Sequence, residues 1–541
     1  MTKIPLASEN LFQTIKEAKE EKGFTLLLDI TCVDYFNKPS AESTRFELIY
    51  ILRHSNFNDL VLYRVAVKDP EIGVESIESL FDSAQWAERE VYDQYGIHFQ
   101  NHSMLKRILN HNEFLGHPLR KDYTITKGQY CTSAQDLMDE MKPLLDQRHL
   151  DIHDDNLMVV NLGPSHPASH GTIRTLAALD GETIVAAASE IGYLHRGFEK
   201  SCENHNYNQI IPYTDRLNYC SAILNNIAFA KTVEDMLQLT LPDRAICIRI
   251  IVGELSRVID HLVCLAAGLL DMGGQTNYWY LYNPRDNAYD FLSKLTGARL
   301  TNSYMRIGGM THDLYEGWES DLEDVLCKID FGITETLKMI THNRIYNDRI
   351  QNISVVSKEQ AINYGFTGPN LRASGVAYDL RFAKPYYGYD TYDFDMVVGS
   401  VGDTYDRMMV RFDEMHESMK IIRQAVKRIP DGPVRVDDKR ISMPEKSCVY
   451  GGIEGMMNQF KLVIDGVQVP EGEHYGAYEA TNGELGFYIV SDGSGTPYKV
   501  KVRPPSFYHM SAYPKIIEGY QVADAIMTLG SLNIIAGEMD R

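Results

Sequence analysis

Two histidines in residues 161–174, NLGPSHPASHGTIR, are the first side chains whose spacing could carry chemistry. His166 and His170 lie four positions apart, a spacing that on a helix would present two imidazoles to one metal ion. Pro167 disfavours a helix there, because proline removes an amide donor and clashes with the preceding turn. A metalloprotease site is therefore disfavoured. For His170, a hydrogen bond that stabilises a turn, a core position and proton transfer at a bound substrate remain open, and we assign His166 a structural or supporting role.

A second set of polar side chains follows one face of a helix that we predict from about Asp243 to Met272, ended by Gly273-Gly274. At 100° per residue the apolar residues fall on one side and a polar stripe about 120° wide on the other. The stripe consists of Glu254, Arg257, Asp260, His261 and Asp271. The simpler interpretation is that it faces solvent. The alternative is that Asp271, at its end, points into a polar cavity.

The composition is that of a folded protein with more than one domain. The chain has 541 residues, of which 44% are hydrophobic and 23% charged, and its net charge is −21. This length predicts at least two domains. The acidic charge argues against nucleic-acid binding, which needs clustered Lys and Arg. No stretch reaches the roughly 18 uncharged residues of a membrane span, and the opening MTKIPLASEN has no basic and apolar export signal.

The cysteines argue against a metal centre held by this chain alone. Eight of them occur, none in a C-x-x-C pair, which is the spacing typical of zinc, iron–sulfur and nickel–iron ligands. We therefore expect reduced thiols and no bound metal. No G-x-G-x-x-G on a strand–turn–helix is present either, so we expect no flavin or nicotinamide bound by this chain.

The N-terminal part has the pattern of a small α/β domain. Residues 24–36 and 44–67 mix β-branched, aromatic and apolar residues between polar turns, which predicts strands of an antiparallel or mixed sheet. Residues 74–96 have apolar residues at helical spacing and end in glycine, which predicts a helix packed on that sheet. The acidic segment that follows predicts a helical or flexible linker. We therefore divide the chain into a domain at 1–130, a linker at 131–155 and a second domain at 156–541.

The second domain begins with strands and continues mainly as helices. Residues 157–162 predict a strand, and Asp180-Gly181 between two β-like runs predicts a hairpin, because this pair tolerates the positive φ of a type I′ turn. The two histidines then lie in a loop between the first two strands. Further helices are predicted at 319–342 and 402–428, and a hairpin at 486–503. The predicted fold class is α+β, a mixed α/β sheet domain followed by a mainly helical domain with small antiparallel sheets.

Ordered motifs along the chain resemble two components of respiratory complex I. EREVYDQYGIHF (88–99) and KRILNHNEFLGHPLRKDY (106–123) are similar to its C-type, 30-kDa subunit. A longer series resembles the D-type, 49-kDa subunit: GPSHPASHG, IGYLHRGFEK, PYTDRLNY, GELSRVIDHL, LTGAR, RIGG, ELGFYIVSDGSGTPYKVKVRPPSF and AGEMDR. The resemblance covers nearly the whole chain and implies a fused C/D subunit of an NADH-quinone oxidoreductase. It also implies a distant likeness to the large subunit of nickel–iron hydrogenases.

The resemblance implies a quinone site at a subunit interface. In the family, a quinone headgroup binds in a cavity between this subunit and a B-type neighbour that holds the terminal [4Fe–4S] cluster. Its two headgroup ligands fall on His170 and Tyr219. Histidine titrates near neutrality and can donate a proton, and a phenol can donate to a carbonyl oxygen. The family's carboxylate partner of the imidazole falls on Asp271, and Arg196 resembles the family arginine near the terminal cluster.

Departures from the family pattern refine these expectations. The C-x-x-C pairs that hold the metal in nickel–iron hydrogenases are replaced by RLNYCSA and IIAGEMDR, which argues against hydrogenase activity. Many relatives have a histidine shortly after Gly-Ala-Arg, near the cluster, where this chain has Thr301. Without that titrating group we predict a lower-potential cluster, and hence menaquinone rather than ubiquinone. EATNG (479–483) in place of the family's EAPRG affects only a minor contact.

We therefore predict a peripheral-arm subunit of a proton-translocating NADH (or related donor):quinone oxidoreductase, active only in its complex. Its partners would be the B-type subunit, other peripheral-arm subunits and the membrane arm, at the cytoplasmic face of a bacterial inner membrane. Two alternatives stay open. The chain could be a non-catalytic connector that docks the cluster-bearing neighbour, or a subunit of a ferredoxin-, F420- or hydrogenase-type relative of the complex.

Overall fold

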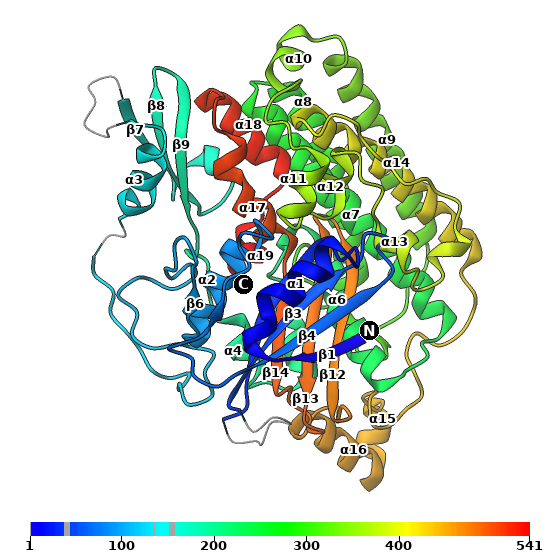
Figure 1. The fold of residues 1–541 in the computed structure, drawn as a ribbon. Helices are drawn as coiled ribbons and strands as arrows, with labels where there is room; N and C mark the ends of the chain where they lie inside the picture. Colours follow the sequence, from blue (N-terminus) through cyan, green and yellow to red (C-terminus); the bar gives the residue numbers. More distant parts are fainter. Residues whose placement is uncertain (1, 37–43, 134–135, 151–156) are drawn as a thin grey trace.

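The computed structural model describes residues 2–36, 44–133, 136–150 and 157–541. Figure 1 shows the N-terminal strands, in blue, lying across the orange strands of a C-terminal sheet. Long helices, in green and yellow, pack on one side, and a small cyan sheet with helix α3 stands on the other. The predicted α+β class, with a sheet-bearing N-terminal part and a mainly helical remainder, is confirmed.

The strands of the described residues form small sheets. They are β1 (Thr2–Leu6), β2 (Leu26–Asp34), β3 (Phe46–Arg53), β4 (Leu60–Val67), β5 (Val74–Glu75), β6 (Phe99–Gln100), β7 (Leu157–Leu162), β8 (Arg174–Asp180), β9 (Thr183–Glu190), β10 (Met305–Arg306), β11 (Gly309–Met310), β12 (Gly472–Ala480), β13 (Gly483–Ser491) and β14 (Lys499–Arg503).

The α-helices are α1 (Leu11–Glu20), α2 (Ala84–Tyr95), α3 (Met138–Asp146), α4 (Phe198–Cys202), α5 (Tyr207–Thr214), α6 (Ala222–Leu237), α7 (Asp243–Asp271), α8 (Gln275–Thr296), α9 (Trp318–Ile340), α10 (Arg344–Ile350), α11 (Lys358–Asn363), α12 (Gly368–Ala373), α13 (Leu380–Ala383), α14 (Thr404–Arg428), α15 (Lys446–Gly451), α16 (Ile453–Ile464), α17 (Pro505–Ile516), α18 (Val522–Leu532) and α19 (Ala536–Asp540). Short 3-10 turns are η1 (Ser8–Asn10), η2 (Pro167–Ser169), η3 (Tyr219–Ser221) and η4 (Tyr389–Thr391).

The N-terminal sheet is mixed, as predicted, in the order β1-β4-β3-β2, with β1 parallel to β4 and the other pairs antiparallel. Helix α2 ends at Gly96, which adopts φ 69°. The prediction of a helix from residue 74 is wrong at its start, because β5 and an irregular stretch precede α2. The buried carboxylate of Glu88 accepts bonds from Ser76 and from the amide of Ile77, and this holds the stretch out of a helix.

The predicted linker is partly an ordered helix. Within 131–155, α3 buries Leu137, Met141 and Leu145 against the small sheet of β7, β8 and β9, where they meet Leu176, Ala178, Ala186 and Ala188. Arg89 of α2 also pairs with Glu140 at 3.2 Å. Residues 134–135 and 151–156 of the linker lie outside the described residues. The helical alternative is therefore the one found for Met138–Asp146.

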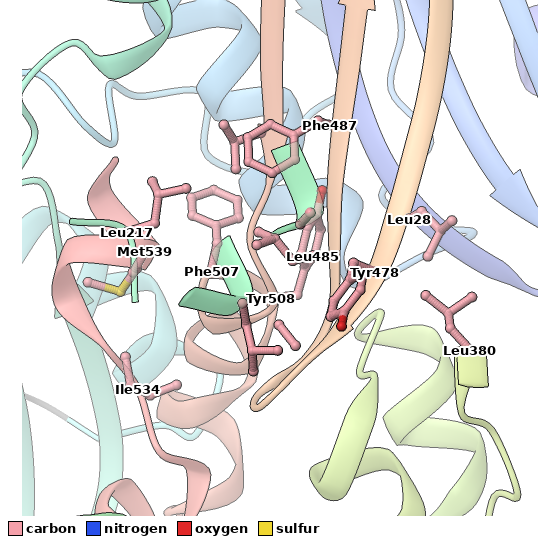
Figure 2. Packing of buried hydrophobic residues seen from close by; sticks show 14 of the residues in the cluster. Leu28, Leu217, Leu380, Tyr478, Leu485, Phe487, Phe507, Tyr508, Ile534 and Met539 are labelled. Carbon is pink, nitrogen blue, oxygen red and sulfur yellow. The ribbon is translucent and has the colours of Figure 1, made fainter. Parts of the chain in front are cut away.

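The two predicted domains share one hydrophobic cluster. It runs from β2 and β3 through β13, β14 and α17 into the helices around α7. Figure 2 shows Leu28 of β2 together with Tyr478, Leu485, Phe487, Phe507 and Tyr508 of the C-terminal elements, all of which belong to this cluster. Polar bonds reinforce this contact: the Tyr508 hydroxyl donates to Asp29 at 2.8 Å, and Arg503 Nε donates to the carbonyl of Leu28 at 3.2 Å.

A buried cluster of charges lies at the same contact. Lys501 of β14 pairs with Glu90 of α2, and Lys499 pairs with Glu199 of α4 at 3.0 Å. Arg541 pairs with both Glu90 and Glu199. Each of these five side chains is no more than 6% exposed. Buried ion pairs, as well as apolar packing, thus join the N-terminal region to the rest of the chain.

The C-terminal elements largely follow the predictions. Helices α7, α9 and α14 lie within two residues of the predicted 243–272, 319–342 and 402–428, and the hairpin at 486–503 is β13–β14. Strand β12, which pairs with β13, was not predicted. In the β8–β9 hairpin Asp180 pairs with Thr183, so the turn residues are Gly181 and Glu182. Only the glycine has a positive φ, at 61°, so the turn is not of type I′.

Among the described helices, none combines the length and apolar character that crossing a bilayer requires.

Candidate functional site

The two histidines lie in the β7–β8 loop, as the sequence predicted, and have different surroundings. His166 is exposed, and its Nδ1 accepts a bond from the amide of Ala168 at 3.2 Å, which caps the 3-10 turn η2. His170 ends that turn in the left-handed region with φ 50°. The two rings therefore do not share a helix face, and His166 has the structural role expected of it.

His170 contacts Asp271 directly. Its Nε2 lies 2.6 Å from Oδ2 of Asp271, and the two side chains are 17% and 20% exposed. Asp271 is the last residue of α7, so a long helix fixed in the core holds the carboxylate, while a short loop supplies the imidazole. The pair is sheltered from bulk water yet open to a bound molecule.

A glycine on α18 makes room for this pair. A Cβ added to Gly530 would lie 3.2 Å from Nε2 of His170 and 3.5 Å from Oδ2 of Asp271. The helix backbone therefore forms one wall of the site, and a Cβ at this position would require the imidazole to move by a few tenths of an ångström.

Tyr219 begins the 3-10 turn η3 and is half-buried. Burial raises the pKa of its phenol to about 12, and the neighbouring Cys220 and Asp260 add to the shift. Among the described residues, no hydrogen bond is formed by the Tyr219 hydroxyl. The phenol is thus neutral at physiological pH and free to donate to a molecule beside it.

The loops that carry His170 and Tyr219 meet at the start of α19. A Cβ added to Gly171 would lie 3.1 Å from Cβ of Ala536, and one added to Gly537 would lie 3.5 Å from Cδ1 of Tyr219. Gly171, the residue after His170, therefore packs on Ala536, and the ring of Tyr219 packs on the next residue, Gly537. Positions 365 residues apart (171 and 536) and 318 residues apart (219 and 537) are brought to one place in this way.

Arg196 lies on the loop before α4 and is exposed. Its Nη2 donates to the carbonyl of Tyr213 on α5 at 2.8 Å. In the described part of the chain, no hydrogen bond joins Arg196 to His170, Tyr219 or Asp271, so it lies outside the contact that they share. Thr301 is half-buried in the loop after α8.

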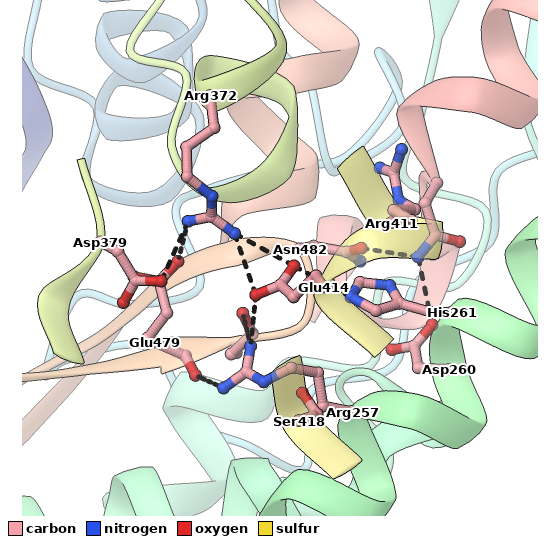
Figure 3. A network of polar contacts seen from close by, with 12 residues as sticks. Arg257, Asp260, His261, Arg372, Asp379, Arg411, Glu414, Ser418, Glu479 and Asn482 are labelled. Carbon is pink, nitrogen blue, oxygen red and sulfur yellow. Dashed lines mark hydrogen bonds and ion pairs between the residues drawn. The ribbon is translucent and has the colours of Figure 1, made fainter. Parts of the chain in front are cut away.

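The polar stripe of α7 does not face solvent, and the simpler interpretation of it is wrong. Glu254, Arg257, Asp260 and His261 are all 0% exposed. Helix α14 and the segments that carry Arg372 and Arg381 cover them, as Figure 3 shows for Arg257, His261, Arg372 and Glu414. Only Asp271, at the end of the stripe, reaches a partly open site, which agrees with the alternative interpretation.

Glu254, Arg257 and His261 of the buried stripe belong to a cluster of paired charges. Glu414 accepts from Arg372 at 3.0 Å, from Arg381 at 2.7 Å and from Nε2 of His261 at 3.1 Å. Burial opposes ionisation, but Arg372, the bond from His261 and Arg381 together hold the pKa of Glu414 well below its usual range. For His261, burial is the largest influence and lowers the pKa, although the bond to Glu414 opposes this shift. Both oxygens of Glu414 are thus bonded within the cluster, while Nδ1 of His261 has no hydrogen-bond partner among the described residues.

Sequence reasoning missed Gly530 and Gly537, and it did not assign Asp260 to the site. The glycines lie within α18 and α19, and nothing in their local sequence distinguishes them from other helical glycines. Asp260 carried a signal, because it lies on the same helix face as Asp271, but the sequence alone did not show that Tyr219 packs beside it.

One group of potential metal ligands occurs among the described residues. His111, Glu113 and Cys131 place ligand atoms within 4.8 Å of one another. Both ring nitrogens of His111 are already used, Nδ1 by the amide of Glu113 and Nε2 by the carbonyl of Ser133. The Glu113 carboxylate caps the amides of Thr132 and Ser133. The geometry is that of a hydrogen-bonded loop closure, and it does not identify a metal site.

Comparisons with known proteins identify the family of the chain. Residues 4–129 match the family described as respiratory-chain NADH dehydrogenase, 30 Kd subunit, and residues 271–541 match its 49 Kd subunit. The chain is 47% identical over 523 residues to the NADH-quinone oxidoreductase C/D subunit of Bdellovibrio bacteriovorus, covering 97% of this chain and 92% of that one. It is 52% identical over 384 residues to the D-type subunit of Myxococcus xanthus, covering 71% and 92%. For the D-type subunit of Pelobacter propionicus the identity is 50% over 388 residues, covering 72% and 96%.

The matches define a fused 30-kDa and 49-kDa type subunit of a respiratory-chain dehydrogenase, as the sequence motifs suggested. The chain belongs to the family of NADH-quinone oxidoreductase C/D subunits. Its partners are therefore other subunits of that complex.

Proposed function

We propose that this chain forms the quinone headgroup site of the complex, beside the terminal [4Fe–4S] cluster of a neighbouring B-type subunit. The 2.6 Å contact between His170 and Asp271, in a partly open position, is the observation that carries the proposal. A titratable imidazole held by a carboxylate and bordered by a phenol with an unused hydroxyl fits the proton demand of quinone reduction.

Reduction of a quinone to the quinol consumes two electrons and two protons. The cluster of the partner would supply the electrons. One proton would come from His170: Asp271 accepts the Nε2–H, which leaves Nδ1–H of the protonated ring to donate to one quinone oxygen. The other would come from the Tyr219 hydroxyl to the second oxygen. Asp271 then stabilises the imidazolium before transfer, and both donors regain protons from solvent after the quinol leaves.

The finer parts of the proposal concern the partner, the quinone and the location. Arg196 is exposed and could face the B-type subunit, where its charge would favour a reduced cluster. Thr301 does not titrate, which supports a low-potential cluster and menaquinone as substrate. The chain would work as a translocase subunit only within its complex, at the cytoplasmic face of the inner membrane.

Two substitutions test the proposal in the purified complex. Tyr219→Phe and His170→Ala should each lower quinone reductase turnover by at least about 100-fold, the usual contribution of a positioned proton donor. Assembly and the cluster's electron paramagnetic resonance signals should stay intact. Tyr130→Phe is the matched control, because Tyr130 is 98% exposed and far from any site residue in the sequence. Unchanged turnover in assembled Tyr219→Phe and His170→Ala complexes would instead identify the chain as a connector.

A further inference from the structure

A buried carboxylate held only by neutral donors lies beside the Tyr219 turn. Asp260 is 0% exposed, and its oxygens accept from Asn218 Nδ2 at 2.7 Å, Ser221 Oγ at 2.8 Å and Asn533 Nδ2 at 3.1 Å. No Lys, Arg or His in the described parts of the chain forms an ion pair with it. By contrast, Glu254 on the same helix pairs with two arginines, and Glu414 on α14 pairs with three.

Two of these donors flank Tyr219 directly. Asn218 precedes it and Ser221 follows two positions later, so the bonds to Asp260 clamp η3 on both sides of the phenol. Within the turn, Asn218 also accepts from the amide of Cys220 at 3.1 Å, and its carbonyl accepts from Asn225 of α6 at 2.8 Å. The backbone that carries Tyr219 is thus fixed to α7 mainly through one carboxylate.

The same helix holds the other proposed proton donor. Asp260 and Asp271 lie eleven positions apart in α7. Eleven residues make about three turns plus 20°, so both carboxylates point to nearly the same side, about 16 Å apart along the axis. Helix α7 therefore fixes the imidazole loop at its end and the phenol turn three turns earlier, and the spacing of the two donors depends on one rigid element.

We propose that Asp260 is the positioning residue for Tyr219: it holds the turn that carries the phenol, and its negative charge disfavours the phenolate. This inference rests on the proposed function, in which Tyr219 donates a proton to the quinone. After donation, the phenolate would lie near a buried negative charge that forms no ion pair with any described residue, so recapture of a proton would be strongly favoured. Asp260 thereby restores the donor between turnovers as well as orienting it.

Titratable side chains from several elements surround Asp260. They are His261 and Cys264 on α7, Cys220 on η3, Tyr289 on α8 and Glu538 on α19; burial is the main cause of the shifted pKa of each, and the carboxylate of Asp260 adds a smaller electrostatic contribution. The cations that influence these groups are Arg411 of α14, for His261 and Cys264, and Arg285 of α8, for Cys220 and Tyr289. Among the described residues, neither arginine forms an ion pair with Asp260. Burial is the main cause of the raised pKa of Tyr219, with contributions from Cys220 and Asp260.

The first test is Asp260→Asn in the assembled complex. We expect quinone reductase turnover to fall by about 10-fold or more, as for other groups that orient a catalytic side chain. The fall of activity at alkaline pH should also begin at lower pH, because a phenol without the neighbouring charge ionises more readily. Asp243→Asn, at the exposed start of the same helix, is the matched control and should change neither quantity.

A double substitution separates charge from general damage to the fold. Asn218 and Asp260 share a single bond between amide nitrogen and carboxylate oxygen. Asn218→Asp together with Asp260→Asn exchanges donor and acceptor and keeps one carboxylate beside Tyr219. We expect the exchange to restore turnover to within about threefold of the parent. Ser221→Ala, which removes one clamp and keeps the charge, should raise the quinone KM without moving the alkaline limb.

The inference is overturned if assembled Asp260→Asn keeps the parental turnover and alkaline limb, or if the exchange variant is no more active than Asp260→Asn. If Asp260→Asn does not assemble, the exchange and Ser221→Ala complexes decide alone. The proposed function fails separately, by unchanged turnover in Tyr219→Phe. Loss of activity in Tyr219→Phe with no effect of Asp260→Asn refutes only the role given to Asp260.

Discussion

The two ends of the polar face of α7 show opposite uses of charge. Glu254, Arg257 and His261 are sealed inside, where Glu254 pairs with Arg257 of the same helix and with Arg381 of a distant segment. Asp271, at the helix end, meets a single histidine and is 20% exposed. Changing the protonation state of a buried, paired group costs several kcal/mol of free energy, so the inner cluster stabilises the fold. The outer pair keeps access to water and to a ligand, so it can take part in chemistry.

The difference teaches that titratable residues on one helix face need not share a role. The buried charges and Asp271 differ in the number of their ion-pair partners and in their exposure to solvent. Each prediction below changes one of these two properties.

The largest effect should come from breaking the inner cluster. Glu414→Ala leaves Arg372 and Arg381 buried without their shared carboxylate, and the loss should be about 3–5 kcal/mol of stability. We expect little assembled complex and a clearly lower thermal midpoint in what is recovered. Glu323→Gln, which breaks the exposed pair with Arg423 at 3.0 Å, is the control and should cost less than about 1 kcal/mol. A normal yield of stable Glu414→Ala complex would contradict a structural role for the cluster.

The next effect should come from crowding the outer pair. Gly530→Ala adds a methyl group 3.2 Å from His170 Nε2 and should displace the ring, which we expect to lower quinone reductase turnover about 100-fold in an assembled complex. Gly268→Ala is the control, because its new Cβ would meet only the flexible ends of Met408 and Met527 at 3.5 and 3.8 Å. Equal activities of the two variants would show that the His170–Asp271 contact is not needed.

A smaller effect should follow when only the charge of the outer pair is removed. Asp271→Asn keeps the shape but no longer stabilises the imidazolium of His170, so we expect turnover to fall between about 10- and 100-fold. Stability should hardly change, in contrast to Glu414→Ala. Measured thermal midpoints and turnover of the two variants, side by side, check the contrast directly.

The smallest effect concerns Glu538, a buried carboxyl that forms no ion pair with any described residue. Burial raises its pKa from 4.5 to about 7. Because the folded-state pKa is the higher one, its stabilising effect is fully present below about pH 4.5 and is lost as pH rises through 7. Glu538→Gln removes this dependence, so its stability relative to the parent should rise by about 2 kcal/mol from pH 5 to pH 8. Thermal unfolding of the two complexes at both pH values tests this, and a constant difference would contradict it.

Much of the framework could be predicted because it depends on local patterns. The long apolar periodicities predicted α7, α9 and α14. The family motifs pointed to His170, Tyr219 and Asp271, and the structure brings His170 and Asp271 into contact. Strand β12 was missed because its two glycines and its charged residues weaken the alternation that marks a strand.

The surroundings of the site could not be predicted, because they depend on contacts between distant segments. A charged face of a helix is solvated in most proteins, and only the folded chain shows that Arg372, Arg381 and Glu414 cover this one. The same holds for Gly530, whose importance comes from His170, 360 positions earlier.

The sealed charges between the N-terminal region and the C-terminal sheet bear on how the chain is assembled. Lys501, Glu90 and Arg541 are held together across the boundary without any help from the connecting segment. Cutting the peptide there should leave both halves attached to each other. Covalent fusion then serves mainly to produce the two parts in equal numbers, because the contacts between their surfaces are sufficient to hold them together.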